Sequence, residues 1–444
     1  MKNTCLCLLL LSLTLHAEEP QVRKFEFEHV VGISLREAIR DAAGKGEKVF
    51  DLFGEHLVDA DLEGIGELNT IEELYLRGSR GYGSNVIGDE GLKSIAKSKS
   101  IKRLRLGALT FTDVGLKYLA VMTQLELLEL DSNDFITGAG LAQLSNLTQL
   151  KSLNLFHCKN LKGDDLQYLK MMTKLEKLII RYMPGLNDAA MGHLASLTQL
   201  RELDFRDSTR EITDLGLEYL KNLNELTSLE LVGMNGVTDV GLQSLRHHPK
   251  LRTLVLQKLT NVTDAGVAVI GELLELRELE LVELPISDVS LEQVKKLKNL
   301  EKGLFWSLHP ASTDGLTVLG QLPKLSSMRS NMKLSNATLE ALASIKSFKI
   351  PIFDVDDEGV RILSALPEIQ EINLADSATD ASLELLANMK SLKYVSVGYH
   401  PRVTPKGVAK LRTQLPDCKV NVSAEGHQHR LFGEPEWVKE AGGN

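Results

Sequence analysis

The chain has 444 residues, more than a single hydrophobic core usually holds, so it must either divide into domains or extend along one axis as a repeat protein. Hydrophobic residues make up 43% of the sequence but aromatic residues only 5%, which favours a repeat built mainly on Leu, Ile and Val. The formal net charge of -9 is spread along the chain without a basic stripe, and this argues against nucleic acid as a partner.

The first residues have the pattern of an export signal. Lys2 supplies a positive start, Leu6–Leu15 an apolar core, and Ala17 ends a cleavage site before Glu18. We therefore expect residues 1–17 to be a signal peptide and the protein to be secreted or periplasmic. The Leu three residues before the cut is a poor match to a cleavage site, so an uncleaved anchor stays open as the alternative. No later stretch reaches ~18 uninterrupted apolar residues, so no membrane span is expected in the mature chain.

A capping segment is expected at 18–46, before the first repeat. Ser34–Ala43 has the pattern of a short amphipathic helix, and VFDLFGEHLVDADLEGI from Val49 is a degenerate first repeat unit. Such a helix would shield the apolar edge of the first coil, as the end of a repeat array requires.

A period of about 25 residues then runs through the chain. It is clearest in LELLELDSNDFITGAGLAQLSNLTQ, LTSLELVGMNGVTDVGLQSLRHHPK and LRTLVLQKLTNVTDAGVAVIGELLE, which begin at Leu125, Leu226 and Leu251. The LxxLxL part alternates apolar and polar residues, as a strand with one buried face must. The TDxGLxxLxxL part spaces Leu for a short helix, with Thr-Asp at its N-terminus.

Such units cannot bury their apolar faces alone, so they must stack. Strands then form a parallel sheet on one side and helices lie on the other. Because strands pack more closely than helices, the stack is expected to curve with the sheet on its concave face. We predict an α/β solenoid, a horseshoe with a parallel β-sheet on the concave face and short helices on the convex face, over residues 47–422.

The LxxLxLxx(N/C) unit resembles leucine-rich repeats, and ITDLGLEYL from Ile212 and VTDAGV from Val262 resemble their TDxGL subclass. That subclass is similar to secreted bacterial repeat proteins and to the repeat region of F-box proteins. The resemblance covers about Val49 to Val422. It departs from the family at the Asn/Cys position, which is filled by Asn133 and Cys158 but by other residues elsewhere, such as Ser79, Leu109, Met183, Ser208 and Leu284.

Two units break the register. RGSRGYGSNV from Arg77 is an insertion rich in Gly and Ser, which predicts a protruding loop. FKIPIFDVDDEG from Phe348 is short and places Pro351 near the middle of a strand, where it removes one ladder donor. We expect a kink there.

The recurring Asp residues of the TDxG motif look catalytic only when each is taken singly. We expect them to form a row along one edge of the solenoid, each binding free N–H groups at the start of its own helix: Asp113, Asp214, Asp239, Asp264, Asp288, Asp314 and Asp380. Asp354–Gly359 begins like a calcium loop but lacks the bidentate Glu at position twelve, so we interpret it as another cap.

No catalytic or metal site is predicted. The pairs His247 with His248 and His427 with His429 have no Cys or carboxylate at ligand spacing, which favours a polar turn and a solvated tail. Cofactors are not expected, and neither HExxH nor GxSxG occurs. Cys158 and Cys418 lie about ten strands apart, roughly 50 Å, so we expect two free thiols.

The concave face carries the candidate binding site. Residues between the buried positions of each strand must point outward, so register alone maps this face. Its first cluster combines aromatic and Arg residues, which are typical of interface hot spots: Phe156, His157, Ile179, Arg181, Tyr182 and Arg206. A second, apolar group consists of Val255, Val282, Leu304 and Trp306. The alternative is that scattered exposed apolar residues carry no function.

The sequence therefore predicts a non-enzymatic scaffold that binds a protein or glycan outside the cytoplasm. The alternative is a substrate-recognition subunit of a ubiquitin ligase, as the F-box resemblance implies, although the residues before Val49 are too few for an F-box once a signal is removed. Residues 423–444 form a polar tail without periodicity, which we predict to be disordered.

Overall fold

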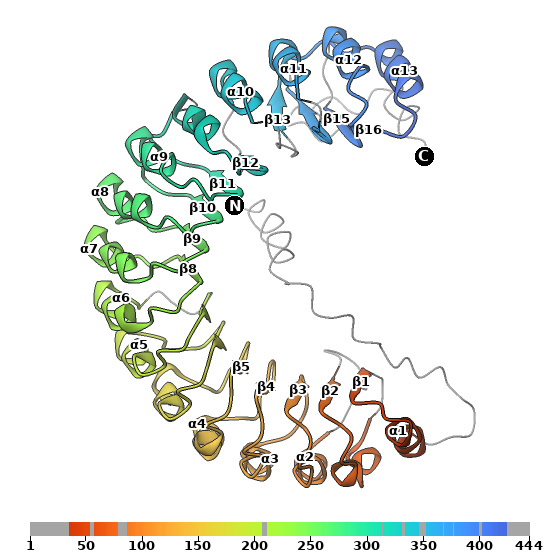
Figure 1. Cartoon of the computed structure of the whole chain (residues 1–444), viewed down its shortest axis with the longest axis vertical. Coiled ribbons are helices and arrows are strands. Elements are labelled where there is room, and N and C mark those ends of the chain that lie inside the picture. The colour runs from red at the N-terminus through yellow and green to blue at the C-terminus, as the bar shows by residue number, and fades with distance from the viewer. Residues whose placement is uncertain are drawn as a thin grey trace, which may run out of the picture. The chain divides into compact units, whose positions relative to one another are not determined.

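The structure is a computed structural model that describes residues 35–53, 57–78, 87–206, 211–312, 314–330, 334–345, 352–366, 368–375, 377–398 and 402–423 (Figure 1). The predicted signal peptide, the insertion after Gly78 and the tail after Ser423 lie outside these residues. The chain divides into two compact units, Met1–Asn160 (unit 1) and Leu161–Asn444 (unit 2), and each is described by itself.

Unit 1 begins with an amphipathic helix and then alternates strands with short helices. Its strands β1 to β5 pair in sequence order, and every pair is parallel. The elements are α1 (Leu35–Gly44), β1 (Val49–Phe53), η2 (Asp59–Leu62), η3 (Ile65–Glu67), β2 (Glu73–Arg77), α2 (Asp89–Ile95), β3 (Arg103–Gly107), α3 (Asp113–Leu119), β4 (Leu127–Glu129), α4 (Gly138–Gln143), η4 (Leu144–Asn146) and β5 (Ser152–Asn154).

Unit 2 continues the same alternation, and its strands β6 to β12 pair in parallel and in sequence order. Its first elements are η5 (Gly163–Leu169), β6 (Lys177–Ile179), α5 (Asp188–Leu194), β7 (Glu202–Asp204), α6 (Asp214–Tyr219), η6 (Leu220–Asn222), β8 (Ser228–Val232), α7 (Asp239–Leu242), η7 (Gln243–His247), β9 (Thr253–Gln257), α8 (Asp264–Val267), η8 (Ala268–Glu272), β10 (Glu278–Val282), α9 (Asp288–Val294), β11 (Lys302–Trp306), η9 (Asp314–Gln321) and β12 (Ser327–Ser330).

A second, four-stranded parallel sheet, β13 to β16, completes unit 2. Its elements are α10 (Asn336–Ala343), β13 (Ile352–Val355), α11 (Asp357–Leu363), β14 (Glu371–Leu374), α12 (Asp380–Leu386), β15 (Tyr394–Gly398), α13 (Pro405–Gln414) and β16 (Lys419–Ser423). The sheet order breaks between β12 and β13, where a kink was predicted, and the register of β13 is irregular between Ile352 and Val355. Pro351 itself lies outside the described residues.

Each strand buries one face against the helices. The central Leu of successive strands in unit 2 is at most 2% exposed, as the list Leu178, Leu203, Leu229, Leu254 and Leu279 illustrates. From β6 to β12 the strands line the inner side of the curve and the helices its outer side (Figure 1). Strands lie ~4.8 Å apart and helices 8–10 Å apart, and this mismatch bends the stack. The predicted parallel sheet with helices behind it is confirmed.

The Thr of each TDxG motif caps its own helix. Thr238 Oγ1 accepts a hydrogen bond from the N–H of Val240 at 3.2 Å, and Thr213 and Thr263 do the same at the starts of α6 and α8. A side-chain oxygen at the N-cap satisfies one of the N–H groups that the first helical turn leaves unpaired.

The Asp of the motif has a different role from the one predicted. Asp239 accepts hydrogen bonds from both the N–H and the hydroxyl of Thr263 in the next coil, each at 2.6 Å. Asp214 binds Thr238 in the same way, and Asp380 binds Thr404. The prediction that each Asp caps its own helix was wrong, because Thr takes that position and leaves the carboxylate to join neighbouring coils.

The Gly of the motif makes room for this carboxylate. A Cβ at Gly241 would lie 2.2 Å from Asp214 Oδ1, and one at Gly266 would lie 2.3 Å from Asp239 Oδ1. Real side chains do not approach so closely, so the Gly in one coil is required by the Asp of the coil before it. The motif Asp354–Gly359 follows the same plan: Asp356 caps α11 and Asp357 binds Thr379.

Candidate functional site

The sheet face opposite the helices is the candidate site, and strand register places its residues. In unit 2, Glu230 lies beside Val255, Val255 beside Glu280, and Glu280 beside Leu304. These residues alternate with buried Leu positions, so they point away from the helices. The prediction that residues between the buried positions share one outward face is therefore confirmed for these strands, and we call this face of β6 to β12 the unit 2 sheet face.

The first predicted cluster divides between the two units. Phe156 and His157 follow β5 in unit 1, with ring centroids 5.9 Å apart. The other four residues belong to unit 2, on or directly after β6 and β7: Ile179, Arg181, Tyr182 and Arg206.

Two of these four residues take part in a charged network. Arg206 binds Asp204 with two nitrogens, at 3.0 and 2.8 Å, and also lies 2.8 Å from Glu230. Arg181 lies 3.9 Å from Asp204. We call Arg181, Asp204, Arg206 and Glu230 the charged network. Because two carboxylates hold Arg206, its guanidinium is engaged within the protein and is less available to a partner.

Burial affects the charge of this network. The Glu230 side chain is 8% exposed, and burial raises the pKa of Glu230 to about 7 although the Arg206 guanidinium opposes this rise. Sequence reasoning did not single out Glu230, because an acid at an outward strand position is expected to be solvated. The available signal was that the register places an apolar residue, Val255, between Glu230 and Glu280 on adjacent strands.

Tyr182 is the most exposed member of the cluster. Its side chain is 44% exposed, and its backbone adopts φ +58, in the left-handed region. The same φ sign recurs where strands end in other coils, at Ala108, Ser132, His157, Gly233, Lys258, Glu283 and Ser307. A large side chain in this region costs about 1–2 kcal/mol relative to Gly. The conformation thus belongs to the repeat, and the feature particular to Tyr182 is that this position carries an exposed aromatic ring.

The second predicted group points outward but is largely covered. Val255 and Val282 are each 5% exposed and Leu304 is 8% exposed, while Trp306 is only half-buried. The expectation of an exposed apolar group was therefore wrong for the three aliphatic residues. Leu304 therefore offers little surface, and Trp306 offers more than the three aliphatic residues.

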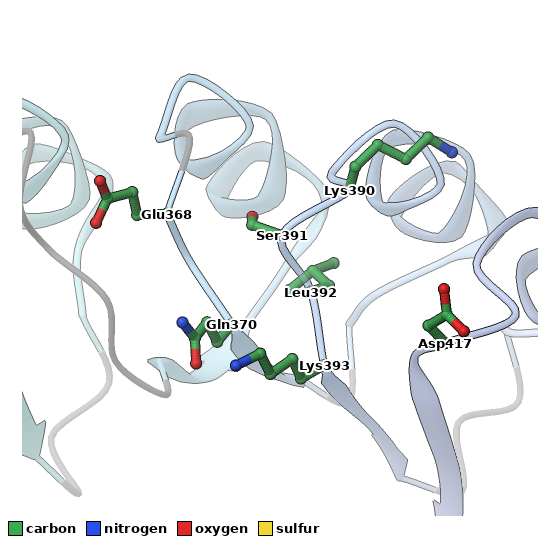
Figure 2. Close-up of a pocket in the computed structure, with 7 residues that line it drawn as sticks. All are labelled: Glu368, Gln370, Lys390, Ser391, Leu392, Lys393 and Asp417. Carbon is green, nitrogen blue, oxygen red and sulfur yellow. The ribbon is translucent and has the colours of Figure 1, made fainter.

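A shallow depression lies at the turns that lead into β14, β15 and β16. Its lining is Glu368, Gln370, Lys390, Ser391, Leu392, Lys393 and Asp417, and Figure 2 shows the charged groups spread around it rather than converging. Ser391 Oγ donates to Ile369 O at 2.7 Å, and Lys390 Nζ donates to Ala387 O at 2.9 Å. These polar groups serve the backbone, so the depression has no arrangement suited to chemistry.

The remaining reactive side chains are structural. Cys158 and Cys418 are free and buried, as predicted, and Cys158 donates to Leu130 O at 3.0 Å while burial raises the pKa of its thiol to about 12. His247 and His248 lie at the end of η7, where a polar turn was predicted, but His248 is buried at 1% exposure and only His247 is exposed. Within the described ranges no three His, Cys, Asp or Glu residues form a metal-binding group; His427 and His429 lie outside those ranges.

Among the helices that the structure describes, none is both long enough and apolar enough to cross a bilayer.

Comparisons with known proteins point to one kind of repeat. A family model described as "Leucine Rich repeat" matches residues 83–96. A search of curated proteins found no match. Among 433 matching chains of solved structures is the internalin InlF of Listeria monocytogenes, 19% identical over 89% of this chain and 95% of that chain, with a TM-score of 0.41.

Two further structures are similar at the same level. Internalin C2 of Listeria monocytogenes is 22% identical over 60% of this chain and 90% of that chain, with a TM-score of 0.37. The Rad7 and Elc1 complex of yeast matches at 18% identity over 75% of this chain and 83% of that chain, with a TM-score of 0.46. At these scores the likenesses add nothing to what the repeats themselves show.

Proposed function

Because the chain is a leucine-rich-repeat protein, an open stack of parallel strands with short helices behind them, we propose that it is a non-catalytic scaffold that binds a protein partner through the unit 2 sheet face. The observation that carries the proposal is the exposed Tyr182 beside the charged network. Rigid aromatic rings and Arg side chains supply most of the binding energy in protein interfaces. A protein partner suits this combination better than a glycan, for which no specific group argues.

The scaffold acts outside the cytoplasm, by this proposal. The support is the sequence pattern from Lys2 to Ala17, which has the positive start, apolar core and small cleavage residue of an export signal. N-terminal sequencing of native protein should begin near Glu18. A native chain that begins at Met1 would count against export with cleavage.

Site-specific photo-crosslinking tests the binding face. A photoreactive amino acid is placed at Gln257, on the unit 2 sheet face, and in a matched variant at the exposed Glu218, on helix α6. Each protein is incubated with the extracellular fluid of its native source and irradiated. We expect one crosslinked partner from Gln257 and none from Glu218. Crosslinking from Glu218 alone would assign binding to the helical side and overturn the proposal.

A further inference from the structure

Glu280 has an unusual place on the unit 2 sheet face. It is the central residue of β10, and its register neighbours are Val255 on β9 and Leu304 on β11, which are 5% and 8% exposed. Two residues further along the same strand, Val282 lies beside Trp306. The carboxylate therefore has apolar side chains on both neighbouring strands and on one side along its own strand, with Glu278 on the other side.

No cation of the described chain neutralises this carboxylate directly. Among the residues that the structure describes, Glu280 has neither an ion pair nor a hydrogen bond through its side chain, whereas Glu230 lies 2.8 Å from Arg206 and Glu278 pairs with Lys302. Burial and the nearby Glu278 raise the pKa of Glu280, and the more distant Arg206 and Arg329 oppose this rise. A half-buried carboxylate without a partner is costly, and a bound cation would remove that cost.

Unit 1 shows how an aromatic ring and a carboxylate on neighbouring strands can hold a cation between them. There Arg105 stacks over the ring of Tyr75, 4.5 Å from its centroid, and lies 3.2 Å from Glu129. These three residues occupy adjacent strands in one register column. An aromatic ring and a carboxylate thus share one guanidinium that the chain itself provides.

We propose that Glu280 and Trp306 form a seat for a Lys or Arg side chain of the protein partner. Glu280 supplies a charge-assisted hydrogen bond, and the face of Trp306 attracts the cation. Glu280 and Trp306 lie on adjacent strands and are offset by two residues along the strand direction, so they are roughly 8 Å apart. This distance leaves room for one cationic group between them. The inference rests on the proposed function and names the chemistry that the partner must present.

A library of random twelve-residue peptides displayed on phage tests the seat. Clones that bind the wild-type protein are selected first. Those that also bind a variant with both Glu280→Gln and Trp306→Leu are then removed, so that only peptides that depend on the seat remain. We expect these peptides to share a Lys or Arg. If depletion removes every clone, or if the surviving peptides lack a basic residue, the proposal is overturned.

Synthetic versions of the surviving peptides give the quantitative result. Glu280→Gln should weaken their binding at least tenfold, and Lys or Arg to Gln in the peptide should have little further effect in that variant. Glu278→Gln is the matched control, because Glu278 lies on the same strand and face but is already paired with Lys302; it should change affinity less than threefold. Equal effects of Glu278→Gln and Glu280→Gln would contradict a specific seat.

Folding and function are separated within the same experiment. Glu280→Gln removes an unpaired, half-buried charge, so its melting temperature should be at least that of the wild type, and Trp306→Leu keeps an apolar side chain in place. If depletion leaves no clone, the removed peptides separate the two proposals: their loss of binding with Tyr182→Ala would overturn the seat and keep the scaffold proposal. Removed peptides that are insensitive to Tyr182→Ala as well would overturn both.

Discussion

At the scale of single residues, each Thr-Asp-x-Gly motif serves two neighbouring coils. Thr238 caps its own helix, whereas Asp239 fixes the backbone and hydroxyl of Thr263 in the next coil. The Gly of that next coil leaves space for the carboxylate. Three residue types at fixed spacing thus encode both a helix start and a joint between coils, which makes the row of Asp side chains structural.

A double-mutant cycle at the last such joint tests this role. Asp380→Ala removes two hydrogen bonds to Thr404, at 2.8 and 2.6 Å, and should lower the free energy of unfolding by about 1–2 kcal/mol. Gly407→Ala should also destabilise, since its Cβ would lie 2.4 Å from Asp380 Oδ1. Urea unfolding should show that Gly407→Ala costs much less when Asp380 is already Ala. Strict additivity would contradict the joint.

Sequence reasoning predicted the row of Asp residues but not their bonding. Both Thr and Asp are good N-cap residues, and their adjacency at a helix start does not reveal which coil each one serves. Only the stacking distance between coils decides this, and that distance follows from packing. The absence of a Cβ at the Gly position was the available signal, since Gly is otherwise unfavourable inside a helix.

A buried His gives the protein a specific acid sensitivity. His248 occupies a turn position filled by Leu223 and Leu273 in neighbouring coils, and burial lowers the pKa of His248 to about 4. Between pH 6.5 and 4 the unfolded chain takes up a proton that the folded chain does not. Stability present above pH 6.5 is therefore lost as pH falls, by up to about 3 kcal/mol.

Unfolding curves of wild type and His248→Leu across this range isolate the effect. Glu230, whose pKa burial raises, favours folding as pH falls, so the difference between the two proteins, not the wild-type curve, carries the result. His248→Leu should be the more stable protein at pH 4 by a larger margin than at pH 7. The exposed neighbour His247 provides the control, and His247→Gln should keep the wild-type pH dependence. A constant margin would exclude a neutral buried imidazole.

At the scale of elements, the strand ends need a left-handed residue and the helices do not. Gly233 follows β8 with φ +70, and no atom lies within 4 Å of where its Cβ would be. Gly192 lies inside α5, and its Cβ would touch Tyr219 at 3.5 Å, an ordinary contact. Neither site would clash with a Cβ, so backbone conformation is the main difference between the two Gly residues.

Replacing each of these residues by Ala should change stability in opposite directions. Gly233→Ala should destabilise by about 1 kcal/mol, because L-residues avoid this conformation, and Gly192→Ala should stabilise by roughly 0.5–1 kcal/mol through helix propensity. Thermal unfolding of the two variants compares them directly. Destabilisation by Gly192→Ala would show that packing, rather than propensity, controls α5.

The strand elements and their register could be predicted from the sequence because alternation fixes which side chains share a face. The burial of side chains on the sheet face that points away from the helices could not be predicted. Val255 and Leu304 are 5% and 8% exposed although they point away from the helices, and the exposure of such positions depends on the rotamers of neighbouring side chains and on sheet curvature, which alternation does not fix. For the same reason the partnerless state of Glu280 became visible only in the structure.

At the scale of the whole molecule, the hydrogen bonds between Asp of one coil and Thr of the next do not run through every coil. The first coil begins with Asp61 accepting from the N–H of Val58, within its own coil, and unit 2 begins in the same way with Asp165 and Lys162. In the coil before it, Gly138 follows the capping Thr137 and occupies the position where other coils have the Asp that binds the next coil. Each unit thus carries its own starting coil, which accords with the division of the chain at Asn160.

Affinity for the captured partner tests the central claim, that the sheet face binds a protein. Tyr182→Ala and Arg181→Ala should each weaken binding by on the order of 2 kcal/mol, about thirtyfold, while Ser228→Ala and Thr253→Ala, on the same sheet face, should change it less than threefold. Titration calorimetry with variants of unchanged melting temperature measures all four. Small and equal effects at all four positions would contradict binding by this face.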